Sequence, residues 1–519
     1  MTKGHNRLTF KPYNMVQPAL MPPTLDELVP KEHLVRVVNQ TIEELNLDPL
    51  LKRYKGGGTS SFHPKMMLKV MVYAYSQKVY TSRKIAKALR ENIQFMWISG
   101  GNKPDFRTIN RFRGSVMKEV VGEVFTSVTE YLVEKKYVKL ENYFVDGTKI
   151  ESSANKYQWV WAKSTTNYKK QLQGKIRVLL DEIDQENEKE EEEYGDDDLE
   201  EMGGGNDDVD GKQLREMVEK LNQRLKDLPD DKKLAKAVKT LETDYLPREE
   251  KYEKQEKILA GRKSYAKTDH DATFMRMKED HMLNGQLKPG YNIQMGTENQ
   301  FIVGFSIHQR PGDTACLISH LEEVKQQLGS LPKRIIADAG YGSEENYNYL
   351  EQEKLENYVK FNLFHKEQKR SWQKQRFRVE NWKYEQESDE YICPSNARLT
   401  FRSEMNKKTE MGYLTRTREY ECQNCSGCPM KSECTRATGN RKVSVSFTMN
   451  RFREQARSNL LSDQGRRLSI QRNVDVESVF GQLKHNLGFR RFYLKGKEKV
   501  RTEWGILCIA HNMAKLAVQ

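Results

Sequence analysis

The sequence predicts an α/β protein in which helices pack on a mixed sheet. Two apolar runs, residues 142–145 and 334–337, are each followed by an aspartate and a glycine-containing turn, which places Asp146 and Asp338 at strand ends. A third acid, Glu477, lies in a segment whose apolar residues recur at helical spacing. Because a helix can return a distant residue to a sheet, the three acids are candidates for one common site.

The chain is long and strongly basic. It has 519 residues, enough for about three domains, and a formal net charge of +13. Residues 181–210 alone hold 17 acidic residues and one lysine, so the remainder of the chain has a net charge of +29. This charge favours a polyanionic partner such as DNA, and a merely soluble basic surface is the alternative.

The sequence contains no signal for membrane insertion or secretion. No run of about 18 apolar residues occurs, and the first residues lead into no apolar segment. Seven cysteines, four of them between Cys422 and Cys434, do not resemble a secreted disulfide framework. We therefore expect a cytoplasmic protein that does not contact a membrane.

Helical patterns dominate residues 1–136, which we expect to bind DNA. After a proline-rich start, residues 81–89 and 105–113 form two short basic helical patterns joined through a Gly-Gly turn. This layout is similar to a helix-turn-helix, in which one helix contacts phosphates or base edges. The residues that would make these contacts are Arg107, Asn110, Arg111 and Arg113. A basic surface on an ordinary helical bundle is the alternative.

One long insertion interrupts the predicted sheet. The sheet begins in residues 137–160 and continues in residues 263–368, where a β-hairpin, a helix, the Asp338 strand, another helix and a last strand follow in order. Counted from the Asp146 strand, this order predicts an RNase H-like mixed sheet with flanking helices. Residues 161–262 are rich in Lys, Glu and Gln and predict a charged helical hairpin with a disordered acidic tip around residues 203–205.

Three converging acids suit metal-dependent phosphodiester chemistry. Two aspartates and a glutamate could hold two Mg²⁺ ions about 3.5 to 4 Å apart. One ion would help to deprotonate the attacking water or hydroxyl, and the other would stabilise the leaving 3′ oxygen. Each acid alone is a weak signal, because an aspartate after a strand is usually a cap or turn residue.

These motifs resemble the DDE transposases of bacterial insertion sequences, whose catalytic domain is RNase H-like. The segments that match are residues 144–149, 337–341, 477–484 and 488–492. The resemblance implies that Asp146, Asp338 and Glu477 form a catalytic triad that uses Mg²⁺, for which Mn²⁺ can substitute. The DNA-contacting residues that it implies are Arg472, Lys484, Arg490 and Arg491. The tyrosine that commonly opens the family's signature has no clear counterpart, and residues 268–272 look like a further family element without an evident role.

Five cysteines have a spacing that suits a structural Zn²⁺. Two CxxC steps and one further cysteine lie between Cys422 and Cys434, and Cys393 lies upstream. The resemblance favours Cys393, Cys425, Cys428 and Cys434 as ligands, with Cys422 as the alternate, and a redox or unliganded set is the other interpretation. This zinc module would span residues 369–448, and residues 449–519 would return to the sheet as C-terminal catalytic helices.

The leading prediction is a transposase that binds the inverted repeats of its own element, cuts the 3′ ends and joins them to target DNA. Its partners would be double-stranded DNA and further copies of the chain, in a homodimer or larger synaptic assembly associated with the bacterial nucleoid. One alternative is a two-metal DNA endonuclease without strand transfer. The other is a non-catalytic DNA-binding protein.

Overall fold

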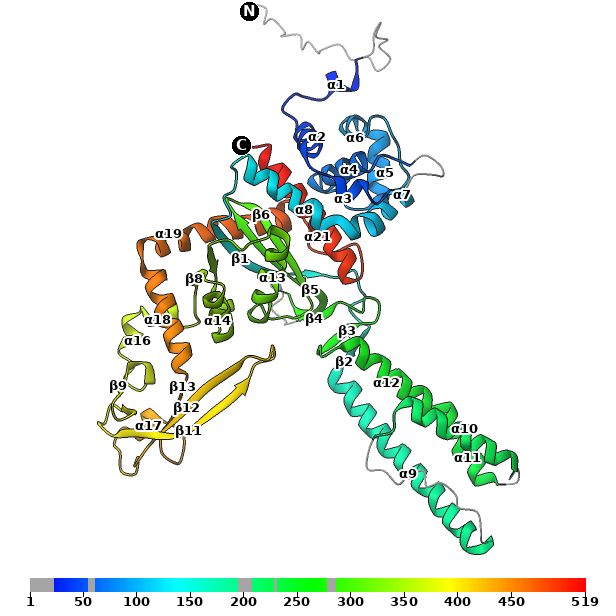
Figure 1. The fold of residues 1–519 in the computed structure, drawn as a ribbon, viewed down its shortest axis with the longest axis vertical. Coiled ribbons are helices and arrows are strands. Elements are labelled where there is room, and N and C mark those ends of the chain that lie inside the picture. Colours follow the sequence, from blue (N-terminus) through cyan, green and yellow to red (C-terminus); the bar gives the residue numbers. More distant parts are fainter. Residues whose placement is uncertain (1–22, 55–60, 195–207, 228–230, 278–285) are drawn as a thin grey trace, which may run out of the picture.

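The computed structural model of the chain describes residues 23–54, 61–194, 208–227, 231–277 and 286–519 (Figure 1). The structure is mixed α/β, which confirms the predicted class. Within the described ranges, no helix is long and apolar enough to cross a membrane.

Helices form the N-terminal region. They are α1 (Leu25–Leu28), α2 (Leu34–Glu44), α3 (Asp48–Leu51), α4 (Pro64–Ser76), α5 (Ser82–Glu91), α6 (Ile93–Ile98), α7 (Phe106–Arg111), the π-helical turn η1 (Phe112–Val116) and α8 (Met117–Glu134). Side chains cap the two basic helices, since Thr81 accepts from Lys84 N and Asp105 accepts from Thr108 N. Both α4 and α8 pack against the last helix, α21 (Lys497–Leu516). One hydrophobic core therefore runs from these helices into the sheet.

The central sheet has six strands. They are β1 (Asn142–Glu151), β4 (Thr273–Arg276), β5 (Leu287–Glu298), β6 (Phe301–His308), β7 (Arg334–Ala337) and β8 (Glu356–Val359). β1, β7 and β8 are parallel neighbours in that order, β5 is antiparallel to β1, and β4 and β6 both pair with β5. In the tight turn between β5 and β6, Asn299 and Gln300 both have positive φ, as the two central residues of a type I′ hairpin turn require.

Helices cover this sheet and link it to the C-terminus. Between β6 and β8 the chain forms η3 (Thr314–Cys316), α13 (Leu317–Leu328), η4 (Ala339–Tyr341) and α14 (Glu344–Gln352). The C-terminal helices are α18 (Phe447–Leu461), α19 (Asp463–Arg472), η6 (Asn473–Glu477), α20 (Ser478–Gly481), η7 (Gln482–Asn486) and α21. η6 contacts both β1 and β5, so the segment that contains Glu477 does return to the sheet.

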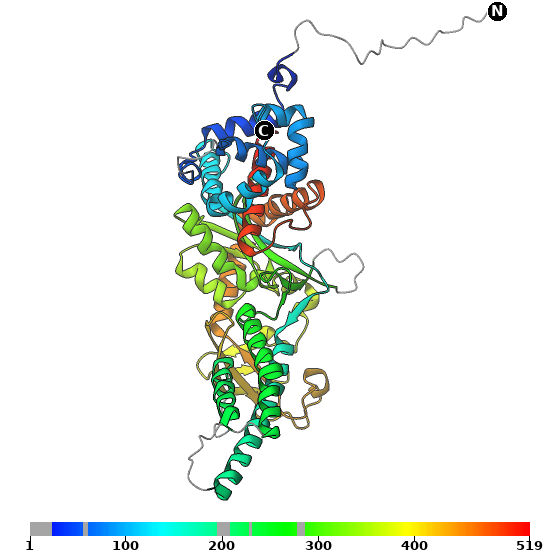
Figure 2. The same cartoon turned by 90° about the vertical axis from the view of Figure 1, so that its right-hand side faces the viewer.

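A helical arm projects from the sheet at the predicted insertion. Its base is the pair β2 (Trp159–Trp161) and β3 (Ser264–Ala266), and its helices are α9 (Ala162–Tyr194), α10 (Gly211–Asp227), α11 (Lys232–Thr240), η2 (Leu241–Tyr245) and α12 (Leu246–Leu259). These helices project together from the sheet (Figure 2), and their apolar side chains form a core of their own. The predicted acidic tip around residues 203–205 lies outside the described residues.

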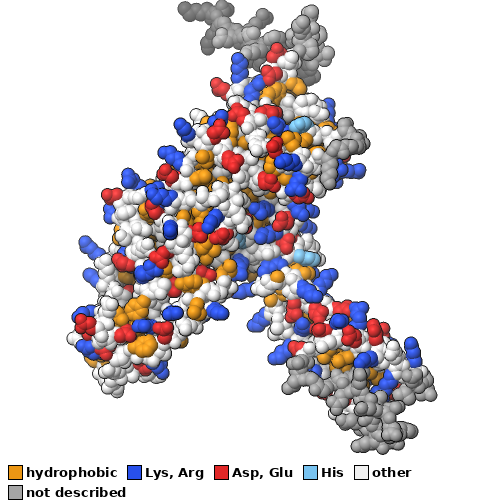
Figure 3. Space-filling model, viewed as in Figure 1, with side chains coloured by type: hydrophobic (Ala, Val, Ile, Leu, Met, Phe, Trp, Pro, Cys, Tyr) orange, Lys and Arg blue, Asp and Glu red, His pale blue; other side chains and the backbone are white. Residues whose placement is uncertain are grey.

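Residues 383–445 form a second projection, which we call the β module. After α15 (Phe364–Glu367), α16 (Arg370–Gln373) and η5 (Val379–Asn381), its strands are β9 (Lys383–Glu385), β10 (Glu390–Ile392), β11 (Arg398–Lys408), β12 (Leu414–Cys422) and β13 (Lys442–Val445), with α17 (Lys431–Cys434) before the last. They form an antiparallel sheet in the order β13-β12-β11-β10-β9. Open space separates the β module from the helical arm on the face shown in Figure 3.

Candidate active site

Asp146 and Asp338 lie at equivalent positions along the neighbouring parallel strands β1 and β7. Val145 of β1 pairs with Ala337 of β7, and the two aspartates directly follow this pair. Asp338 caps the η4 turn by accepting a hydrogen bond from Gly340 N at 2.8 Å, and Asp146 Oδ1 accepts from Gly147 N at 2.7 Å. Asp338 therefore lies at a strand end as predicted, whereas the prediction for Asp146 was wrong, because β1 continues past it to Glu151 and pairs there with β5.

Glu477 joins them from the C-terminal helices. It is the last residue of η6, a π-helical turn that follows α19. π-helical turns are rare, and they occur frequently at functional sites. The turn places Glu477 and the preceding Arg472 on the sheet edge from which the aspartates project.

The guanidinium of Arg472 contacts all three acids. Its Nη2 lies 3.3 Å from Asp146 Oδ2 and 3.9 Å from Asp338 Oδ2, and its Nη1 lies 4.0 Å from Glu477 Oε1. The two aspartate oxygens share one nitrogen, so they are separated by no more than the sum of the first two distances. The three acids, which we call the acid cluster, converge as the sequence analysis requires.

The acid cluster is sealed on one side and open on the other. The side chains of Arg472 and Asp146 are 7% and 14% exposed, whereas those of Asp338 and Glu477 are 44% and 63% exposed. A ligand can therefore reach the carboxylates only from the side of Asp338 and Glu477.

A buried polar network supports the strand of the first acid. Asp313 Oδ1 accepts from Asn292 Nδ2 at 2.8 Å and from Gln294 Nε2 at 3.0 Å, and Tyr341 donates to Gln294 Oε1. A Cβ at Gly147 would lie 2.5 Å from both Asp313 Oδ1 and Gln294 Nε2, so this position tolerates no side chain without displacing them. Sequence reasoning treated Asp313 only as the start of a helix.

Tyr341 and Lys360 are two further groups that the sequence analysis did not select. Burial, followed by the negative charges of Asp313, Asp146 and Asp338, raises the pKa of Tyr341 well above its usual range, so its hydroxyl stays protonated. Lys360 directly follows β8, and its N–H donates to Ala337 O at 3.2 Å. Burial and then the charge of Arg472 lower the pKa of Lys360, against the opposing effect of Asp338 and Glu477. A charged residue directly after an apolar strand was the available signal for Lys360.

The remaining predicted DNA contacts are distributed over several elements. Arg107, Asn110 and Arg111 are exposed on α7, in the helical region beyond α8 and α21 (Figure 1). Arg113 differs, because it is 3% exposed and donates to the Tyr75 hydroxyl at 3.0 Å and to Tyr80 O at 2.7 Å. Its guanidinium faces the interior, where packing against residues distant in sequence holds it, and in this structure it is not placed to contact DNA.

The C-terminal basic residues also have different environments. Lys484 is 7% exposed in η7. Arg490 and Arg491 are exposed, and Arg491 donates to Ser152 O at 3.0 Å and Ala154 O at 3.1 Å. Arg491 therefore attaches the end of β1 to the C-terminal segment, while Arg472 is the predicted DNA contact that the structure brings to the acids.

The five cysteines of the predicted zinc module line one cavity of about 260 Å³. The lining thiols are Cys393, Cys422, Cys425, Cys428 and Cys434. Burial and then a hydrogen bond with Cys425 raise the pKa of Cys422 to about 11, whereas a hydrogen bond with Ser395 lowers the pKa of Cys428. Cys316 and Cys508 are fully buried core residues.

No group of three or more His, Cys, Asp or Glu side chains among the described residues is arranged to hold a metal ion. The predicted structural zinc therefore gains no support from the geometry. The acid cluster is likewise not arranged as a metal site in the described structure, but its donor chemistry suits Mg²⁺, since three carboxylates face one point and two of them are open to solvent. Arg472 is the cation that they surround in this arrangement.

Residues 268–272 join the base of the helical arm to the sheet and to α21. Asp269 accepts hydrogen bonds from Ser152 Oγ at 2.6 Å, the Tyr291 hydroxyl at 2.9 Å and Gly496 N at 3.0 Å. Asp271 accepts from Lys497 N at 2.8 Å. The role that the sequence left undefined is therefore structural.

Two family models match separate parts of the chain. Residues 392–517 match the family model described as a transposase DDE domain, and residues 23–115 match a transposase domain of the DUF772 type. The first match includes Glu477 and the cysteines, and the second includes α7. Together they support the assignment of the chain as a DDE transposase of an insertion sequence. No curated protein and no solved structure matches the chain significantly.

Proposed function

We propose that this transposase binds the ends of its element, cuts their 3′ strands and joins them to target DNA, with Asp146, Asp338 and Glu477 as its catalytic residues. The observation that carries the proposal is the contact of all three acids with one guanidinium at the edge of the sheet. An RNase H-like catalytic domain is supported by the strand order, in which three parallel strands continue into an antiparallel hairpin.

The acid cluster would hold Mg²⁺ or Mn²⁺. Such ions, when bound, activate the attacking oxygen and stabilise the leaving 3′ oxygen of a phosphodiester. Tyr341 contributes by remaining protonated and holding Gln294, which in turn donates to Asp313 behind β1. Lys360 adds positive charge beside the two more exposed acids, where a phosphate would approach.

DNA binding would combine the basic residues that the structure leaves accessible. The exposed Arg107, Asn110 and Arg111 of α7 would contact DNA away from the cut, and the exposed Arg490 would contact it from the C-terminal segment. Lys484 and Arg472 are buried, so they would contact DNA only after a rearrangement. A homodimer or larger assembly is expected, because two element ends must be processed together.

The cysteine cavity is the remaining part of the prediction. We retain structural Zn²⁺ there as a hypothesis that rests on the CxxC spacing of the sequence. Metal analysis of the purified full-length chain tests it, with bound Zn²⁺ that is lost together with the fold of the β module in Cys425→Ser as the expected result.

A strand-transfer assay tests the function. The substrate is a labelled duplex containing the short inverted repeats that flank the gene, incubated with Mg²⁺ and a target plasmid. We expect 3′ nicks and joined products from the unmodified protein, and neither from Asp146→Asn. Cleavage without joining would indicate an endonuclease, and binding with no Mg²⁺-dependent cleavage would reject the catalytic assignment.

The matched control is Glu256→Gln in the helical arm. Glu256 pairs with Lys169 at 2.8 Å on the surface, so its replacement also removes an acid that pairs with a cation, without touching the sheet. Both products should form at unchanged rates in this variant.

A further inference from the structure

We propose that Arg472 is the internal counter-cation of the acid cluster and that divalent metal ions bind there only by displacing it. The inference rests on the proposed function, because it concerns the regulation of the same site. Before DNA binds, Arg472 would neutralise the acids, and only afterwards would it contact DNA.

The contacts of Arg472 are electrostatic and loose. Its nitrogens lie 3.3 to 4.0 Å from the three acids, which is longer than the usual 2.7 to 3.2 Å of an N–H···O hydrogen bond. Its Nε is buried and lacks a hydrogen-bond partner among the described residues. Charge rather than directional bonding therefore holds the guanidinium, and a second cation can compete for the same oxygens.

The charge balance leaves room for that competition. Three carboxylates lie near the guanidinium of Arg472 and the ammonium of Lys360, so the acids still outnumber these two cations while Arg472 is in place. Without a cation between them the three acids would repel one another, so the guanidinium of Arg472 stabilises their convergence. The exposed side chains of Asp338 and Glu477 give incoming cations access from solvent.

The position of Arg472 at the end of a helix would also allow its guanidinium to move away from the acids. It is the last residue of α19, and the π-helical turn η6, which ends at Glu477, follows it directly. A change in this turn would move the guanidinium relative to the acids. A phosphate is the natural new partner, because guanidinium groups bind phosphate oxygens in bidentate geometry. DNA binding should therefore release the carboxylates and strengthen metal binding, as reciprocal coupling between the two ligands requires.

Binding of Mn²⁺ to the full-length protein tests this competition by isothermal titration calorimetry, without any reaction. We expect Arg472→Met to lower the Mn²⁺ dissociation constant about tenfold, a typical size for coupling between two ligands of one site. Arg472→Lys, which keeps the charge, should change it much less. Arg451→Met is the matched control, because Arg451 pairs with the single acid Glu351 at 2.6 and 2.8 Å elsewhere on the surface.

Added DNA supplies a second readout. A duplex of about 30 base pairs, long enough for several phosphate contacts, should tighten Mn²⁺ binding to the unmodified protein. The same duplex should have little effect on Mn²⁺ binding to Arg472→Met, since the competing guanidinium is already absent.

The possible outcomes separate this inference from the proposed function. If Asp146→Asn weakens Mn²⁺ binding while Arg472→Met leaves it unchanged or weaker, the competition is rejected and the metal site stands. If Asp146→Asn has no effect on Mn²⁺ binding, the proposed metal site itself fails. Should Arg472→Met not fold by circular dichroism, Arg472→Gln takes its place in the same comparison, with the same expected tightening.

Discussion

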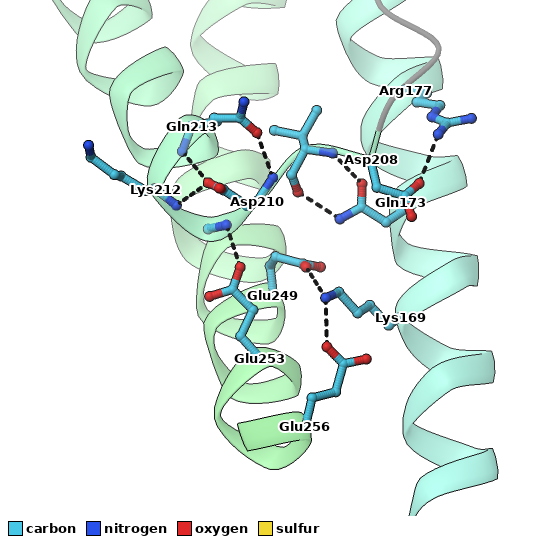
Figure 4. Close-up of polar contacts among 12 residues, drawn as sticks. Lys169, Gln173, Arg177, Asp208, Asp210, Lys212, Gln213, Glu249, Glu253 and Glu256 are labelled. Carbon is cyan, nitrogen blue, oxygen red and sulfur yellow. Dashed lines mark hydrogen bonds and ion pairs between the residues drawn. The ribbon is translucent and has the colours of Figure 1, made fainter. Parts of the chain in front are cut away.

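The acid cluster and the helical arm both place acids beside a cation, but the acids are open to solvent in the first and one is buried in the second. In the acid cluster, three carboxylates share Arg472, and two of them remain open to solvent. In the helical arm, Glu249 of α12 is fully buried and lies 3.4 Å from Lys169 of α9, which also pairs with Glu256 at 2.8 Å (Figure 4). Neither carboxylate oxygen of Glu249 has a hydrogen-bond partner within the described structure.

The difference is one of access. Excess negative charge in the acid cluster can be neutralised by a ligand from solvent, whereas the charge of Glu249 is enclosed between helices. Burial raises the pKa of Glu249 above its ordinary value of 4.5, and the charge of Lys169 opposes this shift. An open acid cluster therefore indicates a binding site, and an enclosed acid indicates a cost to stability.

Replacing the open acids should abolish activity without unfolding the protein. Asp338→Asn and Glu477→Gln are each expected to slow Mg²⁺-dependent cleavage on the order of 10³-fold, because each removes charge that the transition state needs. Thermal melting should stay nearly unchanged, since Arg472 keeps two acidic partners. Single-turnover rates and melting curves check both parts. A large loss of stability in either variant would show that the acids are structural rather than catalytic.

Replacing Asp269, which joins the base of the helical arm to the sheet and to α21, should instead lower stability. Asp269→Ala removes the acceptor shared by Ser152, Tyr291 and the N-terminus of α21, and it should destabilise this junction by about 2–4 kcal/mol. Hydrogen exchange should increase in β3 and in the first turn of α21. The exposed neighbour Lys267→Ala is the control. Unchanged exchange in Asp269→Ala would show that the arm is held by other contacts.

Sequence patterns predicted the parts of the fold where apolar periodicity is strong. The strand before Asp338 and the helical segment of Glu477 are found where the pattern placed them, and the first strand begins as expected but continues past Asp146 to Glu151. The sheet of the β module was missed because β11 is mostly exposed, β12 is mostly half-buried, and both are rich in charged residues, which leaves little alternation to detect.

Site residues were predictable only where a local motif marks them. Arg113 was assigned to the surface from its basic neighbours, but Tyr75 and the buried Glu503, distant in sequence, define an interior position for it. Asp313 and Lys360 approach the acids only through strand pairing. Such long-range contacts depend on the folded chain, and no single segment carries a signal for them.

Neutralising the enclosed acid should stabilise the helical arm. Glu249→Gln removes a buried charge, while Lys169 keeps Glu256 as a partner, so we expect a gain of about 1 kcal/mol in the opening free energy of the arm at pH 7. Hydrogen exchange of α9 and α12 measures this, and Glu256→Gln should show no gain. Cleavage rates should be unaffected. A loss of protection would mean that the pair with Lys169 outweighs the cost of burial.

The pH dependence of the helical arm is the smallest expected effect. Because the folded pKa of Glu249 is raised, the folded arm binds this proton more readily than the unfolded chain does. Its stability should therefore increase as pH falls through the raised pKa toward 4.5, and decrease again as pH rises. Subtracting the profile of Glu249→Gln from that of the unmodified protein, by hydrogen exchange corrected for intrinsic rates, isolates the contribution of this one group. A difference that is flat, or that has the opposite slope, would show that Lys169 fully compensates the burial of Glu249, and the distinction between enclosed and open acids would then rest on the acid cluster alone.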